Sequence, residues 1–177
     1  MRRPIPRARR IEFDERHCRP GMRRRMMITF KRATIVIVYT TEEWLEPAEF
    51  VDILHRSGLA ARRPVDQPER IRRMVKNASI IVCARDAERR LIGIARSLTD
   101  FAFCCYLSDL AVDRAFQGRG IGRELIRKTH GAAGGDAVTL LLLSAPAAMG
   151  YYPHIGLTRL DNCYGMPRAV REPKAPA

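Results

Sequence analysis

The chain has 177 residues, 46% of them hydrophobic, and carries a formal net charge of +13. This length favours one domain with a real core, because a folded chain of this size removes roughly 70% of its unfolded surface from water. Overall disorder is therefore excluded. The longest apolar stretch, residues 137–149, is shorter than the roughly 20 residues that a membrane span needs, so a transmembrane helix is excluded as well.

The positive charge is concentrated at the N-terminus. Residues 1–32 hold 12 basic and 3 acidic residues, and residues 1–27 lack apolar periodicity. We interpret residues 1–27 as a flexible basic arm and residues 28–177 as a single domain. The arm is open to three interpretations: a tether for nucleic acid, a solvated tail, or a product of translation starting at an internal methionine. The scarcity of aromatic residues disfavours the nucleic-acid tether.

Past the arm, periodicity and turn residues predict alternating strands and helices. The predicted strands are residues 33–41, 79–84, 91–97, 103–112 and 138–143, with one or two more near 158–166. The predicted helices are residues 42–58, 68–77, 121–131 and a short one at 147–152. The run 138–143 is almost wholly apolar, which predicts a strand buried on both faces. This order indicates an α/β fold with a mixed sheet.

The five cysteines are Cys18, Cys83, Cys104, Cys105 and Cys163. Their number is odd, and no CxxC pair or histidine at zinc spacing accompanies them, so neither a disulfide framework nor a metal site is expected. Free thiols fit a reducing compartment, and we expect a cytoplasmic protein.

A glycine-rich turn between the strand 103–112 and the next helix holds the most informative residues. N–H groups in the first turn of a helix lack internal partners, so this turn suits a phosphate. A P-loop is disfavoured because no Lys-Ser or Lys-Thr pair follows the glycines at the distance that G-x-x-x-x-G-K-[ST] requires, and a dinucleotide fingerprint is disfavoured because Arg123 replaces its third glycine. The pattern that fits is Q-x-x-G-x-G, formed by Gln117, Gly118, Arg119, Gly120, Ile121 and Gly122.

This motif resembles motif A of the GNAT superfamily of N-acetyltransferases. The preceding Leu110, Ala111 and Val112 are similar to the family's strand four, and the segment 151–157 (YYPHIGL) is similar to its late aromatic element. The resemblance spans roughly residues 33–166. It implies the GNAT fold, with a mostly antiparallel sheet, flanking helices, and parallel strands four (103–112) and five (138–143) that splay apart.

The resemblance also implies a site and a mechanism. Acetyl-CoA, as cosubstrate, would lie between the splayed strands, with its pyrophosphate on the amides of residues 119–123 and the charges of Arg119 and Arg123. The N–H of Leu110 or Val112 would polarise the thioester oxygen during direct attack by an amine. Tyr152 matches the family's general acid, and its ordinary pKa near 10 leaves it protonated at neutral pH.

The general base is left open. Asp109 lies on the strand 103–112, where many family members place an acid, although Ser108 stands where some of them carry glutamate. Asp109 has three candidate roles: accepting a proton, orienting a cationic substrate, or pairing with an arginine such as Arg96.

We therefore expect an acetyl-CoA-dependent N-acetyltransferase that acts on a primary amine of a small molecule. Two alternatives stay open: acetylation of aminoacyl-tRNA or a protein amine, which the basic arm and the arginines at 62–73 motivate, and a non-catalytic acyl-CoA-binding module. No metal and no membrane partner are expected, and nucleic acid is not the favoured partner. The family commonly dimerises, so the resemblance also admits a homodimer.

Overall fold

The computed structural model describes residues 25–30 and 33–166. These residues divide into two compact units, one up to Leu141 and the other from Leu142 onward. The single domain expected over residues 28–177 stays a prediction. The two units are treated separately below. Most of the predicted arm lies outside the described residues.

The first unit is built on a six-stranded sheet in which the strands follow their sequence order. The strands are β1 (Arg25–Phe30), β2 (Ala33–Thr41), β3 (Ile80–Arg85), β4 (Leu91–Thr99), β5 (Cys104–Val112) and β6 (Thr139–Leu141). The pairs from β1 to β5 are antiparallel, whereas β5 and β6 are parallel. The predicted mixed, mostly antiparallel sheet, with a parallel pair formed by strands 103–112 and 138–143, is thus confirmed.

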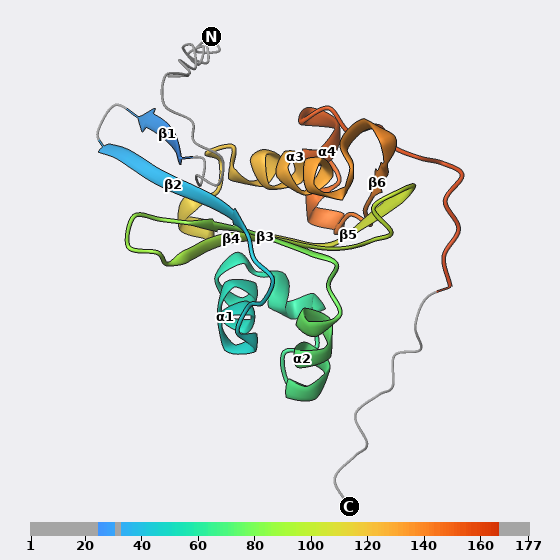
Figure 1. The fold of residues 1–177 in the computed structure, drawn as a ribbon, viewed down its shortest axis with the longest axis horizontal. Helices are drawn as coiled ribbons and strands as arrows, with labels where there is room; N and C mark the ends of the chain where they lie inside the picture. The colour runs from blue at the N-terminus through green and yellow to red at the C-terminus, as the bar shows by residue number, and fades with distance from the viewer. Residues whose placement is uncertain (1–24, 31–32, 167–177) are drawn as a thin grey trace, which may run out of the picture. The chain divides into compact units, whose positions relative to one another are not determined.

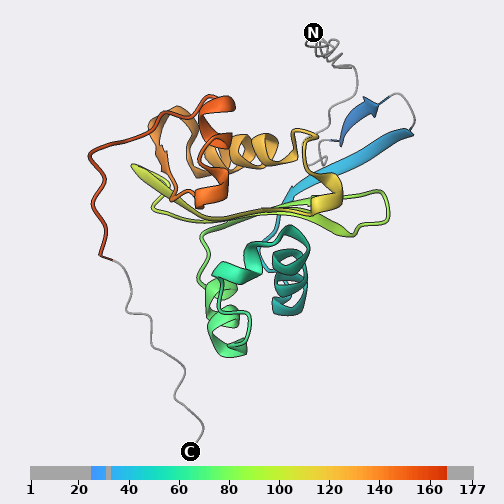
Figure 2. The same ribbon diagram turned by 180° about the vertical axis from the view of Figure 1, so that it is seen from behind.

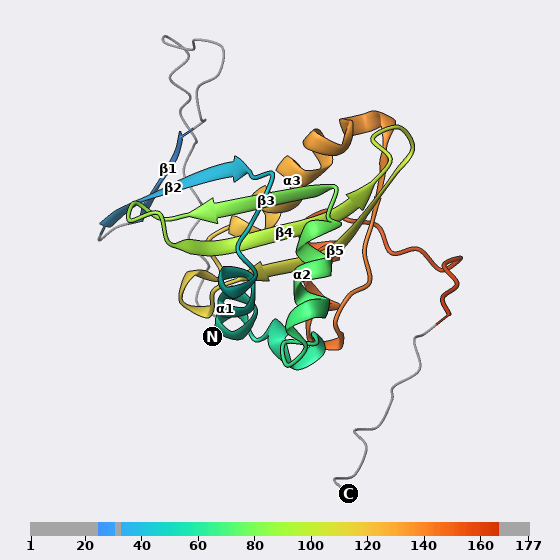
Figure 3. The same ribbon diagram turned by 60° about the horizontal axis from the view of Figure 1, so that its bottom comes forward.

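Two helices cover one face of the sheet and a third covers the other, as opposite views in Figures 1 and 2 both show. Helices α1 (Pro47–Ser57) and α2 (Pro68–Lys76) lie in front of the strands in Figure 3, and α3 (Ile121–Ala133) lies behind them. Both front helices begin with a proline, which suits the first helical turn because proline lacks the N–H that would be unpaired there. Their buried faces join β3 and β4 in one apolar core.

Helix α3 approaches the sheet closely at Gly93 of β4. A Cβ added there would lie 3.1 Å from side-chain carbons of Ile121 and of Leu125. Both of those side chains are fully buried, so the contact fixes the first turn of α3 against β4. The position of the glycine turn that precedes α3 is therefore fixed by the packing of α3 against β4.

Several predicted elements differ from the observed ones. The strand expected at 138–143 forms a ladder only over Thr139–Leu141, and Thr139 and Leu141 are exposed, so the prediction of burial on both faces is wrong. The reason is its place as the last strand of the sheet, paired with β5 alone. Helix α3 runs past Gly131 and ends at Ala133, with Gly134 as its C-cap, and β1 begins at Arg25, inside the predicted arm.

The second unit contains less regular structure than predicted. The helix expected at 147–152 is divided into a short 3-10 turn (Pro146–Ala148) and α4 (Tyr151–His154). No strand forms over residues 158–166, so that prediction is wrong for the described chain. Apolar residues such as Leu160 and Tyr164 are exposed there, which removes the burial that would favour a strand.

Candidate active site

The parallel pair separates part of the way along β5. Its register runs from Cys104 opposite Thr139 to Tyr106 opposite Leu141, and β5 continues to Val112 without β6 beside it. A register shift against β4 follows at once, because Arg96 lies opposite Asp109 while Ser97 lies opposite Leu107. Ser108 is therefore the extra residue of a β-bulge, a feature that bends a strand and redirects its side chains.

Beyond the bulge, β5 presents backbone groups to its open edge. The N–H of Asp113 donates to the carbonyl oxygen of Ile92 next to β4, at 2.9 Å. Since neighbouring residues of a strand direct their N–H groups to alternate sides, the N–H groups of Leu110 and Val112 point away from β4. The Val112 carbonyl confirms this direction, because it accepts a hydrogen bond from Gln117 Nε2 at 3.0 Å, across that edge.

The glycine turn follows directly. Gly118 and Gly120 have φ angles of 73° and 79°, the left-handed region that side chains disfavour, and a Cβ on either would meet nothing within 4 Å. The backbone is thus exposed in a conformation that glycine permits. The N–H of Glu124 donates to the carbonyl oxygen of Gly120 (3.1 Å), so α3 has its first internal bond there.

The N–H groups before that bond, those of Ile121, Gly122 and Arg123, begin the helix without an internal acceptor. They add to the positive end of the helix dipole, which favours an anion at this point. Arg119 is half-buried and donates to the carbonyl oxygen of Ala115 (3.2 Å), while the Arg123 side chain is exposed. The two arginines lie on either side of this turn in the sequence, and the Arg119 guanidinium lies over the Phe116 ring, 5.3 Å from its centroid.

Asp113 fixes the entry into the turn, a role that the sequence analysis missed. One carboxylate oxygen accepts the N–H of Ala115 at 2.9 Å, and the other accepts a hydrogen bond from Arg56 of α1. Burial pushes the pKa of this carboxyl up, but those two hydrogen bonds outweigh burial and hold the pKa below its usual range. The signal available in the sequence was an aspartate between a strand and a turn, a common N-cap position.

Asp109 is buried with its carboxylate shared between two arginines. One oxygen accepts a hydrogen bond from Arg63 Nε, and the other accepts one from Arg96 Nε. The Arg96 guanidinium also donates to Ser108 Oγ at 2.7 Å and to the Met74 carbonyl at 3.2 Å. The arginine pairing that the sequence left open as one role of Asp109 is thus present, and Arg63 is a partner that the sequence did not identify.

Tyr152 lies in the second unit, on α4. Its ring meets that of Tyr151 edge to face, with centroids 5.3 Å apart. Burial raises the pKa of Tyr152, which keeps the phenol protonated well above neutral pH. The first unit therefore brings together the residues predicted at 109–112 and 117–123, and Tyr152 belongs to a separate body.

Neither a metal-binding cluster nor a membrane-spanning helix is present among the residues that the structure describes. There, no group of three or more histidine, cysteine or acidic side chains is placed to hold a metal ion. Within the same residues, no helix is long and apolar enough to cross a membrane.

The fold and the turn together define a class of protein. It is an α/β protein in which the pairing of two parallel strands stops close to a β-bulge, and a glycine-rich turn leads from the bulged strand into the next helix. The model of the acetyltransferase (GNAT) family matches residues 39–156, which is most of the first unit and the start of the second. The chain belongs to this family, and membership places it among the acyltransferases.

Individual relatives are more distant. The chain is 28% identical over 113 residues to an uncharacterized N-acetyltransferase, ycf52, of Pyropia yezoensis, a match that covers 59% of this chain and 62% of that protein. Its fold is similar to that of a GNAT-family acetyltransferase of Streptococcus pneumoniae (TM-score 0.60, 22% identity, 77% of this chain and 99% of the other). It is also similar to aminoglycoside N-acetyltransferase AAC(6')-Iy, solved with CoA (TM-score 0.59, 13% identity, 80% and 100% covered).

Proposed function

We propose that this protein transfers an acetyl group from acetyl-CoA to a primary amine of a small molecule. The observation that carries the proposal is the row of N–H groups at the start of α3, which lies next to the open edge of β5. The family consists of acetyltransferases, and one structural neighbour was solved with CoA, which supports the choice of donor.

The residues of the turn fit the phosphates of acetyl-CoA. Left-handed Gly118 and Gly120 leave open space above the backbone, so the pyrophosphate can approach the N–H groups of residues 121–123. The guanidinium groups of Arg119 and Arg123 supply charge-assisted hydrogen bonds. Acetyl-CoA brings the activated thioester, and the chain holds it and directs the attack.

The open edge of β5 serves the acyl group. A thioester carbonyl placed against the N–H of Leu110 or Val112 gains a donor where negative charge develops during attack by the amine. Both groups belong to a strand fixed by β4 on its other edge, so they need no rearrangement at that moment. Ala111, between them, turns its side chain into the core of α1 and α2.

We assign Asp109 a positioning role. Each of its two oxygens accepts a hydrogen bond from a guanidinium group. The lone pairs that point toward the arginines are therefore occupied and cannot accept a proton from a substrate. Asp109 instead holds Arg96 against Ser108 at the bulge. Tyr152 is the proposed general acid for the departing thiolate, supported by its place in the late motif and by the raised pKa that keeps its proton in place.

The test measures thiol release from acetyl-CoA with a panel of primary amines. Tyr152→Phe is expected to lower kcat about 100-fold or more while CoA still binds, as removal of a general acid does. Tyr151→Phe is the matched control, since it removes a phenol from the same helix, and it should retain kcat. Equal rates for wild type and Tyr152→Phe with every amine would reject Tyr152 as the acid.

The same panel separates the enzyme from a non-catalytic module. CoA binding by calorimetry without thiol release for any amine would show an acyl-CoA-binding protein. We also propose a reducing, cytoplasmic location, which is supported by the free state of the four cysteines that the structure describes, Cys83, Cys104, Cys105 and Cys163.

A further inference from the structure

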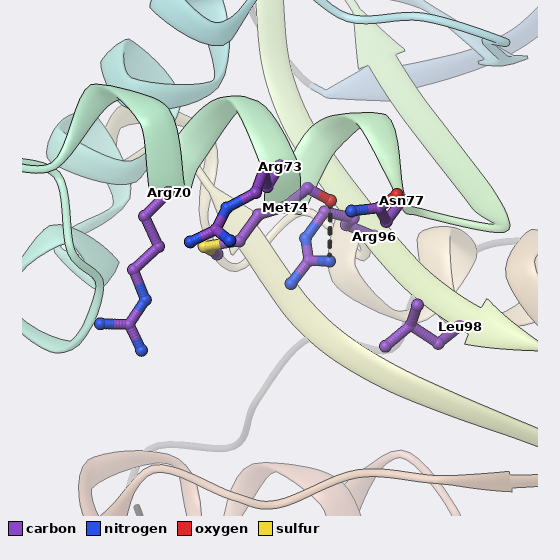
Figure 4. Close-up of a pocket in the computed structure, with 6 residues that line it drawn as sticks. All are labelled: Arg70, Arg73, Met74, Asn77, Arg96 and Leu98. Carbon is purple, nitrogen blue, oxygen red and sulfur yellow. Dashed lines mark hydrogen bonds between the residues drawn. The ribbon is translucent and has the colours of Figure 1, made fainter.

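A cavity of about 380 Å³ lies between α2 and the sheet in the first unit. It is lined by Arg70, Arg73, Met74, Asn77, Arg96 and Leu98. Figure 4 shows the side chains of Arg70 and Arg73 leaving α2 toward the same space that the Arg96 guanidinium faces from β4. We call this cavity the α2 arginine pocket.

The spacing along α2 explains how its arginines reach the pocket. Arg70, Arg73 and Asn77 are three and four residues apart, so they share one face of the helix. Ile71 and Val75 are buried on the opposite side and fix the rotation of α2. The arginines of the pocket face are therefore presented by a packed helix rather than by a loop.

The pocket carries more positive charge than its surroundings balance. Within the described chain, Arg70 and Arg73 have no carboxylate within ion-pair distance, and no acidic residue lines the pocket. Glu69, next in sequence, lines a neighbouring hollow together with Arg70 and Arg73, but the ion pair that its carboxylate makes is with Arg72 Nε, at 3.9 Å. Arg96 has a partner in Asp109, but that single carboxylate also serves Arg63.

The closeness of these positive charges is electrostatically unfavourable when no anion is bound. Like charges one helical turn apart repel each other, and helix α2 holds Arg70 and Arg73 in that relation. An oxyanion would relieve the repulsion, because guanidinium groups bind the paired oxygens of a carboxylate or phosphate through two parallel hydrogen bonds. The pocket is open to solvent, so the three guanidinium groups on its lining, rather than enclosure, would hold the anion.

The position of the pocket connects it to the transfer site. Arg96, at the base of the pocket, donates to Ser108 Oγ at the bulge, and Leu110 follows two residues later with its N–H on the open edge of β5. A molecule held by Arg70 and Arg73 thus lies on the α2 side of the strand that would hold the thioester.

We propose that the α2 arginine pocket binds a carboxylate or phosphate group carried by the acceptor amine. This inference rests on the proposed function, because it names the acceptor class of that site. It selects small amines with an anionic group over neutral amines and polyamines.

The test compares acceptors that differ only in the anion: 4-aminobutyrate against butylamine for a carboxylate, and O-phosphoethanolamine against ethanolamine for a phosphate. We expect kcat/KM to be at least about tenfold higher for the anionic member of one pair, the scale of one charge-assisted contact. The pair with the larger ratio identifies the source of the anion. Equal values within both pairs would overturn the proposal.

Two variants test whether the preference for anionic acceptors comes from the α2 arginine pocket. The double variant Arg70→Gln/Arg73→Gln should bring that ratio close to one. Arg72→Gln is the control, since Arg72 lies on the same helix with a side chain 63% exposed and outside the pocket lining, and it should keep the ratio. Thermal melting verifies that each variant is folded. An equal fall of the ratio in both would overturn the pocket and indicate a general surface charge.

Titration with inorganic phosphate by calorimetry, in the presence of saturating CoA so that the turn before α3 is already occupied, separates failure of the pocket from failure of the transfer reaction. Phosphate that binds to wild type and to Arg72→Gln, but not to the double variant, supports the pocket. This conclusion holds even if no amine causes thiol release, a result that would reject the transferase function but not the pocket. Thiol release without phosphate binding or anion selectivity rejects the pocket and keeps the transferase. Retention of an RNA oligonucleotide, lost equally in both variants, would favour a nucleic-acid surface and also overturn the pocket.

Discussion

The two faces of the sheet present different kinds of hydrogen-bond donor to the anions proposed to bind there. On the α3 face, the donors are backbone N–H groups at the positive end of a helix dipole, in a turn whose shape depends on left-handed Gly118 and Gly120. On the α2 face, the donors are the guanidinium groups of Arg70, Arg73 and Arg96. Backbone donors are fixed in place by the fold, whereas side-chain donors carry full charge and depend on what packs around them.

The faces also differ in their buried polar groups. Asp109, below α2, is completely buried and bonded to two arginines, whereas Tyr39 of β2, below α3, is buried with no hydrogen-bond partner for its hydroxyl among the described residues. Removing a paired charge leaves its partners uncompensated, while removing an unpaired hydroxyl relieves a cost. Substitutions on the two faces should therefore change stability in opposite directions.

The largest effect is expected at Asp109. Asp109→Asn leaves Arg63 and Arg96 without their shared carboxylate and should lower the free energy of unfolding by about 3–5 kcal/mol, the usual result of breaking a buried ion pair. Urea unfolding measures the loss. Asp136→Asn, at an exposed aspartate, is the control and should change little. A loss below about 1 kcal/mol would mean that the α2 face does not depend on this network.

A smaller effect is expected at the glycine turn, in binding rather than in stability. Gly120→Asp places a side chain at a φ of 79° and a negative charge beside the N–H groups of α3, so CoA affinity should fall about 10- to 100-fold. Calorimetry with CoA measures the change. Gly131→Asp introduces the same charge where a Cβ also meets open space, and it should bind like wild type. Unchanged affinity in Gly120→Asp would refute the phosphate site.

The smallest effect is expected at Tyr39 and has the opposite sign. Tyr39→Phe removes the unpaired hydroxyl and should raise the free energy of unfolding by about 1 kcal/mol at neutral pH. The matched control Tyr106→Phe, at an exposed tyrosine, should leave it unchanged. A loss of stability in Tyr39→Phe would show that the hydroxyl has a partner.

Tyr39 also gives the α3 face a pH dependence. Burial, with a further contribution from Glu124, raises the pKa of Tyr39 above its ordinary value of 10.0. Above pH 10 the unfolded chain therefore releases a proton that the folded chain keeps, so stability falls by about 1.4 kcal/mol per pH unit from this group. Unfolding measured between pH 9 and 11 should show a shallower fall in Tyr39→Phe than in wild type. Parallel curves would contradict this origin.

Much of the α3 face could be predicted from sequence because its signals are local. The strand Ala33–Thr41 follows from its β-branched residues, and the glycine turn follows from spacing that backbone geometry requires. The same reasoning failed for residues 138–143, because an apolar run reports hydrophobicity but not whether other elements cover both faces. The strand predicted at 158–166 failed because its apolar residues, such as Leu160 and Tyr164, are exposed.

The α2 face could not be predicted to the same depth. The sequence shows arginines at 62, 63, 70, 72 and 73 as one basic run. In the structure, Arg63 is bonded to buried Asp109, Arg70 and Arg73 line a pocket, and Arg72 is exposed. These three environments depend on the rotation of α2 and on the bulge at Ser108. Neither feature can be predicted from local composition.

The sequence by itself determined the class of fold, the family resemblance and the position of the glycine turn, because glycine conformation and strand periodicity act over a few residues. Tertiary structure decided which charges are neutralised and which are left for a ligand. That outcome depends on contacts between β4, β5 and α2, since the free energy of a buried charge depends on the groups packed against it.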